Sequence, residues 1–376
     1  MVSINILQYG CTANYDNGNI LAGLLIENNH SIVNNTEEAD VVIVNSCTVK
    51  GKTADKIHHK IRELIEEGKK LVVTGCMPAA DNKLLKEIAP KAALISTQNI
   101  TEINNVISKL LEGENLILTN KRKEIKLGLP KLNPDNKIAS LQISEGCASH
   151  CGFCSTKLAK GNLYSYPKEK IVEEMKKYVE QGYKRINLTS TDNGCYGIDL
   201  GYNLVDLLKD VIAIEGDFKL RVGMANPEHV KKYYKELADI YKNEKIMKFI
   251  HIPVQAGSDK ILEEMNRKYT VEEYKRIVEE FRKQIPGITI ATDIIVGYPT
   301  EDDSDFVKTV ELVKELKFEV INISKFASRP RTKANKLKQL TSEVIKERSV
   351  ELTKVYLETK ENKEIEEELI EIDILE

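Results

Sequence analysis

The chain has 376 residues, of which 41% are hydrophobic and 30% are charged, and its net charge is −3. This length predicts two or three domains with ordinary cores, and no apolar run approaches the roughly 20 residues of a membrane helix. The N-terminus shows no signal-peptide pattern, and the seven cysteines, in metal-like spacings, favour a reducing cytoplasm over a disulfide framework. We therefore expect a cytoplasmic protein without membrane attachment.

Residues 1–115 alternate strand-like and helix-like segments. Strands are expected at 2–9, 41–46, 71–75 and 92–96, and helices at 14–29, 51–68, 81–89 and 101–112. The continuous Val, Ile and Leu runs indicate strands buried on both faces, as in a parallel sheet. Residues 116–138 contain Gly128, Pro130 and Pro134 among charged residues, and we interpret them as a linker.

Three of the expected strands end in a cysteine. Cys11, Cys47 and Cys76 follow the runs INILQYG, VVIVNS and LVVTG. The carboxyl edge of a parallel sheet is where such sheets bind ligands, and the three thiolates would lie together there. They could carry an iron–sulfur cluster with one open iron. The alternative is that small buried cysteines end strands by chance, but three such turns favour a functional set.

From residue 139 to about 330 a regular strand-then-helix rhythm follows. Strands are expected at IASLQIS, RINLTS, FKLRVG, IMKFIHI, ITIATDIIV and FEVINIS, and helices at 169–182, 203–214, 228–243, 258–266, 271–285 and 303–317. These units are too few for a closed eight-fold barrel and predict a partial (β/α)6 barrel, open on one side for a large substrate. Functional groups in such barrels lie on loops after the strand ends.

The loop after the first barrel strand holds Cys147, Cys151 and Cys154 in a C-x3-C-x2-C spacing. Three cysteines this close can bind three irons of a [4Fe–4S] cube and leave the fourth iron open, whereas ferredoxins usually close all four sites. A zinc site is the alternative, but structural zinc usually takes two C-x2-C pairs. No second pair exists, and His150 is poorly spaced as a fourth ligand. The spacing therefore predicts an open cluster.

This loop, with the aromatic Phe153 before its third cysteine, resembles the radical S-adenosylmethionine (SAM) motif, in which SAM occupies the free iron. Residues 1–340 resemble radical SAM methylthiotransferases, and most of all the archaeal and eukaryotic branch that modifies threonylcarbamoyladenosine in tRNA. The shared pieces are GCTAN, VNSCTVKGKTAD, TGCMPAA, EGCASHCGFCSTKLAKG, TDNGCYGID, HIPVQAGSD, MNRKYT, DIIVGYPTE and SRPRTKA. The assignment to this branch rests on three of these pieces, CTVKGKTAD, TKLAKG and SRPRTKA.

By this resemblance, the three loop cysteines are ligands of the SAM cluster and the three strand-end cysteines are ligands of an auxiliary [4Fe–4S] cluster. In the family, one SAM methylates a sulfur held at the auxiliary cluster, and a second SAM is cleaved to methionine and a 5′-deoxyadenosyl radical. The radical abstracts hydrogen from C2 of the adenosine, where the methylthio group is delivered. The resemblance thus implies a tRNA-modifying transferase that acts next to the anticodon and needs an electron donor such as a ferredoxin or flavodoxin.

Further candidate contacts to SAM lie at the ends of barrel strands. Asp192 ends the second strand, with a turn cap as its alternative role. Gln255 and Ser258 follow the fourth strand, although Ser258 could instead N-cap the next helix. Gly297 shapes a tight turn after the fifth strand, which lets the backbone approach adenine. Arg267 in MNRKYT could reach a carboxylate or a phosphate, or could lie on the surface.

Other positions carry weaker expectations. Asn14 follows the first strand-end cysteine at the family spacing and is expected to support that site. The acid–Ser pair that usually follows is replaced by Asn17 and Gly18. Cys195, on a barrel loop, is interpreted as an inert buried thiol, and His229 as a surface residue of a helix.

Residues 331–376 begin with a basic segment and end in an acidic helical tail. Most relatives carry a small RNA-binding β-barrel module here, and in this chain we expect the module to be absent or truncated. Contact with RNA phosphates would then fall to the basic segments 121–131 and 328–338.

Three alternatives to the threonylcarbamoyladenosine substrate stay open. Two keep the chemistry and change the substrate to isopentenyladenosine in tRNA or to an aspartate of a ribosomal protein. The third is a non-enzymatic iron–sulfur or RNA-binding protein, which would not cleave SAM. The sulfur source cannot be inferred from the residues.

Overall fold

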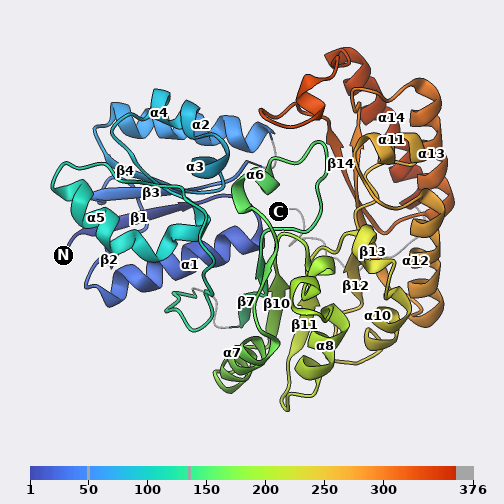
Figure 1. The fold of residues 1–376 in the computed structure, drawn as a ribbon, viewed down its shortest axis with the longest axis horizontal. Helices are drawn as coiled ribbons and strands as arrows, with labels where there is room; N and C mark the ends of the chain where they lie inside the picture. The colour runs from blue at the N-terminus through green and yellow to red at the C-terminus, as the bar shows by residue number, and fades with distance from the viewer. Residues whose placement is uncertain (49–50, 134–136, 361–376) are drawn as a thin grey trace.

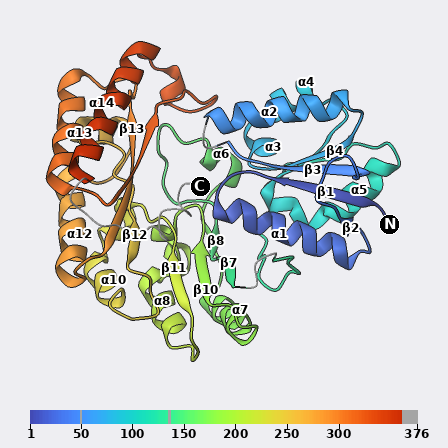
Figure 2. The same ribbon diagram turned by 180° about the vertical axis from the view of Figure 1, so that it is seen from behind.

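The structure is a computed structural model that describes residues 1–48, 51–133 and 137–360. An N-terminal parallel sheet and a partial barrel lie side by side, and the short helix α6 (Thr156–Lys160) lies between them (Figure 1). The reverse view shows the same two bodies, with α1 and α2 on opposite faces of the N-terminal sheet (Figure 2). In the described parts of the chain, no helix is both long and apolar enough to cross a membrane.

The N-terminal sheet has the strand order β2-β1-β3-β4-β5-β6, and every pair in it is parallel. Its strands are β1 (Ser3–Gln8), β2 (Ser31–Ile32), β3 (Val41–Ser46), β4 (Lys70–Gly75), β5 (Ala93–Ile95) and β6 (Ile117–Leu118). The four expected strands form. The two-residue strands β2 and β6 are too short to leave a sequence signal, and β6 comes from the segment interpreted as a linker.

Helices cover both faces of this sheet because successive side chains of a strand point to opposite faces. Val41 and Ile43 of β3 pack against one helical layer, and Val42 and Val44 pack against the other. The first layer contains α1 (Thr12–Glu27) and α5 (Ile103–Leu111), and the second contains α2 (Gly51–Glu66), α3 (Met77–Ala80) and α4 (Asn82–Ile88). The two apolar layers leave only the strand ends free to form a site.

The barrel consists of two parallel three-stranded sheets, β7-β10-β11 and β12-β13-β14. A parallel bridge between Leu220 and Ile246 joins the two sheets. The strands are β7 (Ile138–Gln142), β10 (Arg185–Thr189), β11 (Lys219–Val222), β12 (Phe249–His251), β13 (Thr289–Val296) and β14 (Val320–Lys325). The α/β class and the open barrel expected from the sequence are confirmed. A small antiparallel pair, β8 (Ser144–Glu145) with β9 (Tyr164–Ser165), flanks the cluster loop and was not predicted.

Helices follow the barrel strands close to the expected ranges. They are α7 (Lys168–Glu180), α8 (Leu204–Ile212), α9 (Pro227–Val230), α10 (Tyr234–Ile240), α11 (Asp259–Glu264), α12 (Val271–Gln284) and α13 (Asp303–Leu316). The single helix expected at 228–243 is wrong, because it is divided into α9 and α10. Tyr233 leaves the helical conformation between them, and its hydroxyl donates to the Gly194 carbonyl oxygen at 2.5 Å.

The helix α14 (Ser342–Lys360) covers β14 and α13. Leu352 is fully buried in this contact, and the Tyr356 hydroxyl donates to the Glu319 carbonyl oxygen at 2.9 Å. The expected helical tail is thus helical as far as Lys360. Its most acidic part, 361–376, lies outside the described residues.

Arg348 fastens α14 to the loop after β13. Its guanidinium donates to Glu301 Oε2 at 2.8 Å, and the same carboxylate oxygen accepts from the Gly297 backbone N–H at 2.7 Å. We expect Arg348→Ala to lower the free energy of unfolding by about 3 kcal/mol, because the buried Glu301 carboxylate loses its cation. Urea denaturation measures this change.

Lys354→Ala is the matched control on the same helix. Its exposed ion pair with Glu358, at 4.0 Å, should be worth less than about 0.5 kcal/mol. Equal losses in the two variants would show that the Arg348 contact does not stabilise the helix.

Candidate iron–sulfur cluster sites

The strand-end cysteines lie at one edge of the N-terminal sheet. Cys11 follows β1, Cys47 follows β3 and Cys76 follows β4, and these three parallel strands are adjacent in the sheet. Gly10 allows the close approach of the first two loops. It has a φ of +108°, and a side-chain carbon placed there would lie 2.9 Å from Cys47 Cβ and 3.1 Å from its Sγ. The positions expected for the three thiols are therefore those found.

Asn14 fixes the first two of these loops relative to each other. Its side-chain amide donates to the Tyr9 carbonyl oxygen at 2.5 Å and to the Ser46 carbonyl oxygen at 3.3 Å. In return, the Asn45 amide donates to the Asn14 carbonyl oxygen at 2.7 Å. Asn14 thus supports the strand-end site through the backbone of both loops.

The residues at and beside the positions of the acid–Ser pair have a different role in this chain. Asn17 Oδ1 accepts from Lys126 Nζ at 2.8 Å and from the Gln142 amide at 2.9 Å, and Asp16 pairs with Lys131 at 2.8 Å. These contacts join α1 to the segment before the barrel and to its first strand.

The loop cysteines are held by two sequence motifs from elsewhere in the barrel. In MNRKYT, the Met265 carbonyl oxygen accepts from the Gly152 N–H at 2.8 Å, and the Asn266 amide donates to the His150 carbonyl oxygen at 2.6 Å. In SRPRTKA, the Ala334 N–H donates to the Gly152 carbonyl oxygen at 3.0 Å. Backbone hydrogen bonds from both motifs therefore set the shape of the cluster loop.

Arg267 is buried against this loop. Its guanidinium donates to Cys151 Sγ at 3.3 Å, to the Pro253 carbonyl oxygen at 3.2 Å and to the Tyr269 hydroxyl at 2.9 Å. Burial raises the pKa of Cys151 to about 11, and the positive charge of Arg267 opposes this rise. The surface alternative for Arg267 is wrong. Its planar guanidinium hydrogen-bonds the cluster cysteine directly and contacts two further groups at the same time.

We expect Arg267→Lys to lower SAM cleavage by roughly 10- to 100-fold, the usual effect of changing a group that supports metal ligands. Lysine keeps the positive charge but lacks the planar guanidinium, whose several N–H groups donate to different acceptors at once. Iron content and the rate of 5′-deoxyadenosine formation measure the effect. Arg276→Lys, on the exposed face of α12, is the matched control and should leave both unchanged. An unaltered rate in Arg267→Lys would contradict this role.

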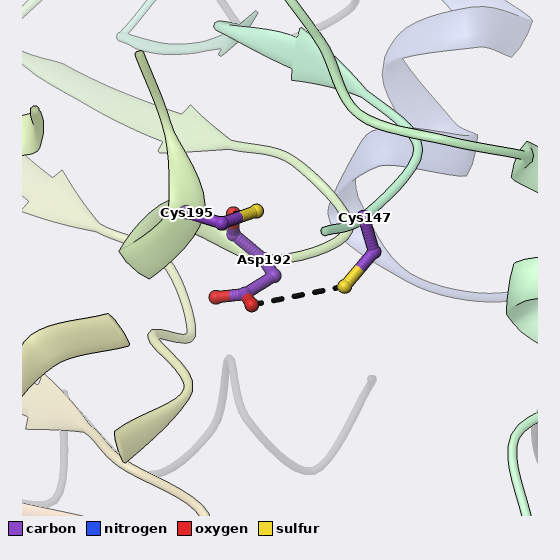
Figure 3. Close-up of side chains that lie close together, drawn as sticks. All are labelled: Cys147, Asp192 and Cys195. Carbon is purple, nitrogen blue, oxygen red and sulfur yellow. Dashed lines mark hydrogen bonds between the residues drawn. The ribbon is translucent and has the colours of Figure 1, made fainter. Parts of the chain in front are cut away.

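Asp192 lies beneath the cluster loop (Figure 3). One carboxylate oxygen, Oδ1, accepts from the Gly194 and Asn226 backbone N–H groups, both at 2.9 Å, so Asp192 caps a turn. The other oxygen, Oδ2, lies 3.8 Å from Cys147 Sγ. The turn cap named as an alternative is thus present, and a second oxygen remains directed at the cluster loop.

Two further residues lie close to Asp192 and the cluster loop. The ligand atoms of Cys147, Asp192 and Cys195 lie within 4.8 Å of one another, and the fully buried Cys195 donates to the Asp192 carbonyl oxygen at 3.2 Å. The interpretation of His229 as a surface residue is wrong. It is buried, and its Nε2 lies 2.9 Å from Ser149 Oγ within the cluster loop. Its position after the third barrel strand, where functional groups gather, was the available signal.

The remaining candidates for SAM contact lie around the barrel. Gln255 is buried with a φ of +74°, a strained conformation that tends to mark functional sites. The Ser258 hydroxyl donates to Asp305 at 2.7 Å and makes no capping bond. Gly297, with a φ of +78°, leaves no room for a side chain, since a carbon there would lie 2.5 Å from Ile345. Phe153 is half-buried against the barrel core.

Both cysteine sets fit [4Fe–4S] clusters. Each supplies three soft thiolate ligands, as a cube with one open iron requires. Burial raises the pKa of Cys76 to about 12, and a bound iron would supply the positive charge that a buried thiolate needs. Among the described residues, neither set brings its three sulfurs within 4.8 Å of one another.

Known sequences match the whole of this architecture. The Radical SAM superfamily matches residues 141–313, and a family described as Uncharacterized protein family UPF0004 matches residues 3–97. A probable threonylcarbamoyladenosine tRNA methylthiotransferase of Pyrococcus horikoshii is 45% identical over 95% of this chain and 84% of its own length. The chain belongs to the radical SAM methylthiotransferases. The human threonylcarbamoyladenosine tRNA methylthiotransferase is 38% identical over 93% of the chain and 62% of its own length.

Solved structures share the fold of this methylthiotransferase. TsrM, a radical S-adenosylmethionine methyltransferase from Kitasatospora setae, solved with cobalamin and a [4Fe-4S] cluster bound, superposes with a TM-score of 0.65 at 16% identity. That match covers 88% of this chain and 73% of TsrM. The cobalamin-dependent enzyme OxsB superposes with a TM-score of 0.60 at 12% identity over 95% of this chain and 56% of its own. The three proteins therefore share the fold over most of this chain.

Membership of this family makes the protein an enzyme that transfers sulfur-containing groups with SAM and [4Fe–4S] clusters as cofactors. The two cysteine sets described above are the residues that would hold the clusters.

Proposed function

We propose that this methylthiotransferase attaches a methylthio group to C2 of N6-threonylcarbamoyladenosine next to the anticodon of tRNA, using two SAM molecules and two [4Fe–4S] clusters. The observation that carries this proposal is that residues next to the two cysteine sets contact each other across the domains. Ser155, directly after Cys154, has its hydroxyl 3.5 Å from the carbonyl oxygen of Thr48, directly after Cys47. Ala159 of α6 packs against Cys76.

The division of labour follows from this arrangement. When bound, the clusters and SAM supply the radical and the sulfur chemistry. The chain's own part is to hold both cysteine sets at a fixed separation, to keep water out and to orient the adenosine. The contacts of Arg267, Asn14 and the MNRKYT loop serve the first of these tasks.

A cavity of about 430 Å³ beside the cluster loop supports a nucleic-acid substrate. Its lining includes His150 and Lys157 of the loop and helix, together with Lys121 and Arg331. The last two come from the two basic segments, which are far apart in sequence. Such a cationic hollow beside the reactive centre suits a phosphate backbone. The relatives named for threonylcarbamoyladenosine support this branch over isopentenyladenosine.

The test is mass spectrometry of tRNA nucleosides from cells that lack their own methylthiotransferases and express this chain. We expect 2-methylthio-N6-threonylcarbamoyladenosine, and none of it from the Cys147→Ala control. The isopentenyl product alone would overturn the branch. Methylthiolated aspartate in a ribosomal protein, without modified tRNA, would overturn the substrate class. A cytoplasmic location and a ferredoxin or flavodoxin as electron donor belong to the same proposal.

A further inference from the structure

Lys160 is a buried cation whose ammonium has no hydrogen-bond partner among the described residues. It ends α6, and only 4% of its side chain is exposed. Within residues 1–48, 51–133 and 137–360, the carboxylate oxygen that pairs with it, Glu145 Oε2, lies 3.6 Å from Nζ. Buried polar groups are nearly always hydrogen-bonded, so an ammonium left in this state calls for an explanation.

Glu145 does not neutralise this cation, because it is shared. Its other oxygen, Oε1, pairs with the buried Lys126, which also donates to Asn17. The neighbouring Lys131 is paired with Asp16. This buried group therefore contains three lysines and two acids. One positive charge lacks a counter-charge, and Lys160 is the member with no hydrogen bond.

The end of α6 that carries Lys160 packs against the strand-end site. Ala159, its chain neighbour, packs against Cys76 and Ala80. The charge of Lys160 is the largest influence that favours the Cys76 thiolate and so lowers the pKa of that thiol against burial. After Glu145, Cys76 and Cys11 are the groups whose negative charge acts most strongly on Lys160. The missing counter-charge thus lies in the direction of the auxiliary site.

We propose that Lys160 is a positioning residue of the auxiliary cluster, whose ammonium donates a hydrogen bond to a sulfur atom at that cluster and raises the cluster's reduction potential. The inference rests on the proposed function, since it requires the second cluster. Net charge and hydrogen bonds to sulfur set the potentials of such clusters, and groups behind the ligands orient and tune a metal site. A fixed cation here also stabilises anionic sulfur on the side that faces the barrel.

The experiment isolates the auxiliary cluster. The parent is the full chain with Cys147, Cys151 and Cys154 all replaced by Ala, reconstituted anaerobically to about four irons. Lys160→Met removes the charge at similar volume, and Lys160→Arg keeps it. Lys177→Met is the control for the loss of one lysine charge, because Lys177 is exposed on α7 and pairs with Glu173 rather than with Glu145. Each variant receives an iron and sulfide assay and a redox titration monitored by electron paramagnetic resonance.

We expect Lys160→Met to bind iron like the parent but to be reduced only at a more negative potential, while Lys160→Arg and Lys177→Met stay close to the parent. An unchanged potential in Lys160→Met, or an equal shift in Lys177→Met, would overturn the proposal. If Lys160→Met binds no iron, the iron content of Lys160→Arg distinguishes the two explanations. Iron bound by Lys160→Arg would show that the site needs a positive charge at this position. No iron in Lys160→Arg would show that Lys160 only supports folding and would overturn the proposal. A parent that binds no iron would instead refute the two-cluster function.

Discussion

Cys147→Ala should abolish the formation of 5′-deoxyadenosine from SAM. The loop then keeps only two thiolates, one fewer than a cube with one open iron takes from it. Chromatography of reactions run under reducing, anaerobic conditions measures the loss, which should reach the background without enzyme.

Cys195→Ala is the control for that result, because it removes a thiol from the same neighbourhood. Cys195 is fully buried and its thiol hydrogen-bonds the Asp192 carbonyl oxygen. We expect SAM cleavage to survive in this variant. Loss of cleavage in Cys195→Ala to the same level would mean that the ligand set of the SAM cluster includes Cys195.

Cys47→Ala should separate the two activities. Iron after reconstitution should fall from about eight to about four per chain, since the strand-end site loses a ligand and the loop site does not. SAM cleavage should persist, while the methylthiolated nucleoside should disappear from tRNA.

The comparison with Cys147→Ala completes this prediction. That variant should also bind about four irons, but in the strand-end site, and should lose cleavage and product together. An equal loss of cleavage in both variants would show that the two cysteine sets do not have separate roles. A wild-type chain that binds about four irons would refute the two-cluster arrangement.

The sequence predicted the placement of the cysteines because the strands and their parallel arrangement followed from local signals. Buried runs of Val and Ile mark β1, β3 and β4, and a cysteine at the end of each parallel strand must lie at the shared edge. The spacing in the cluster loop is a local property as well. These features needed no knowledge of distant contacts.

Other features depend on partners far along the chain and could not be predicted. Lys126, Glu145 and Lys160 would ordinarily be assigned to the surface, yet all three are buried, and Lys126 donates to Asn17 of α1. Arg267 was ambiguous, since its partner Cys151 lies 116 positions away. The division of the helix at Tyr233 likewise depends on a hydroxyl bond to a distant loop.

The packing of α6 on α3 has a consequence for the maturation of the protein. Cys76 is enclosed once Ala159 has docked against it at the end of the N-terminal sheet. Only 4% of Cys76 is then exposed, so a preassembled cluster cannot reach this thiol through the contact. Delivery by an assembly scaffold must therefore precede docking of the two domains or accompany their transient separation. The order of synthesis favours the former, since the strand-end site is translated before α6 exists.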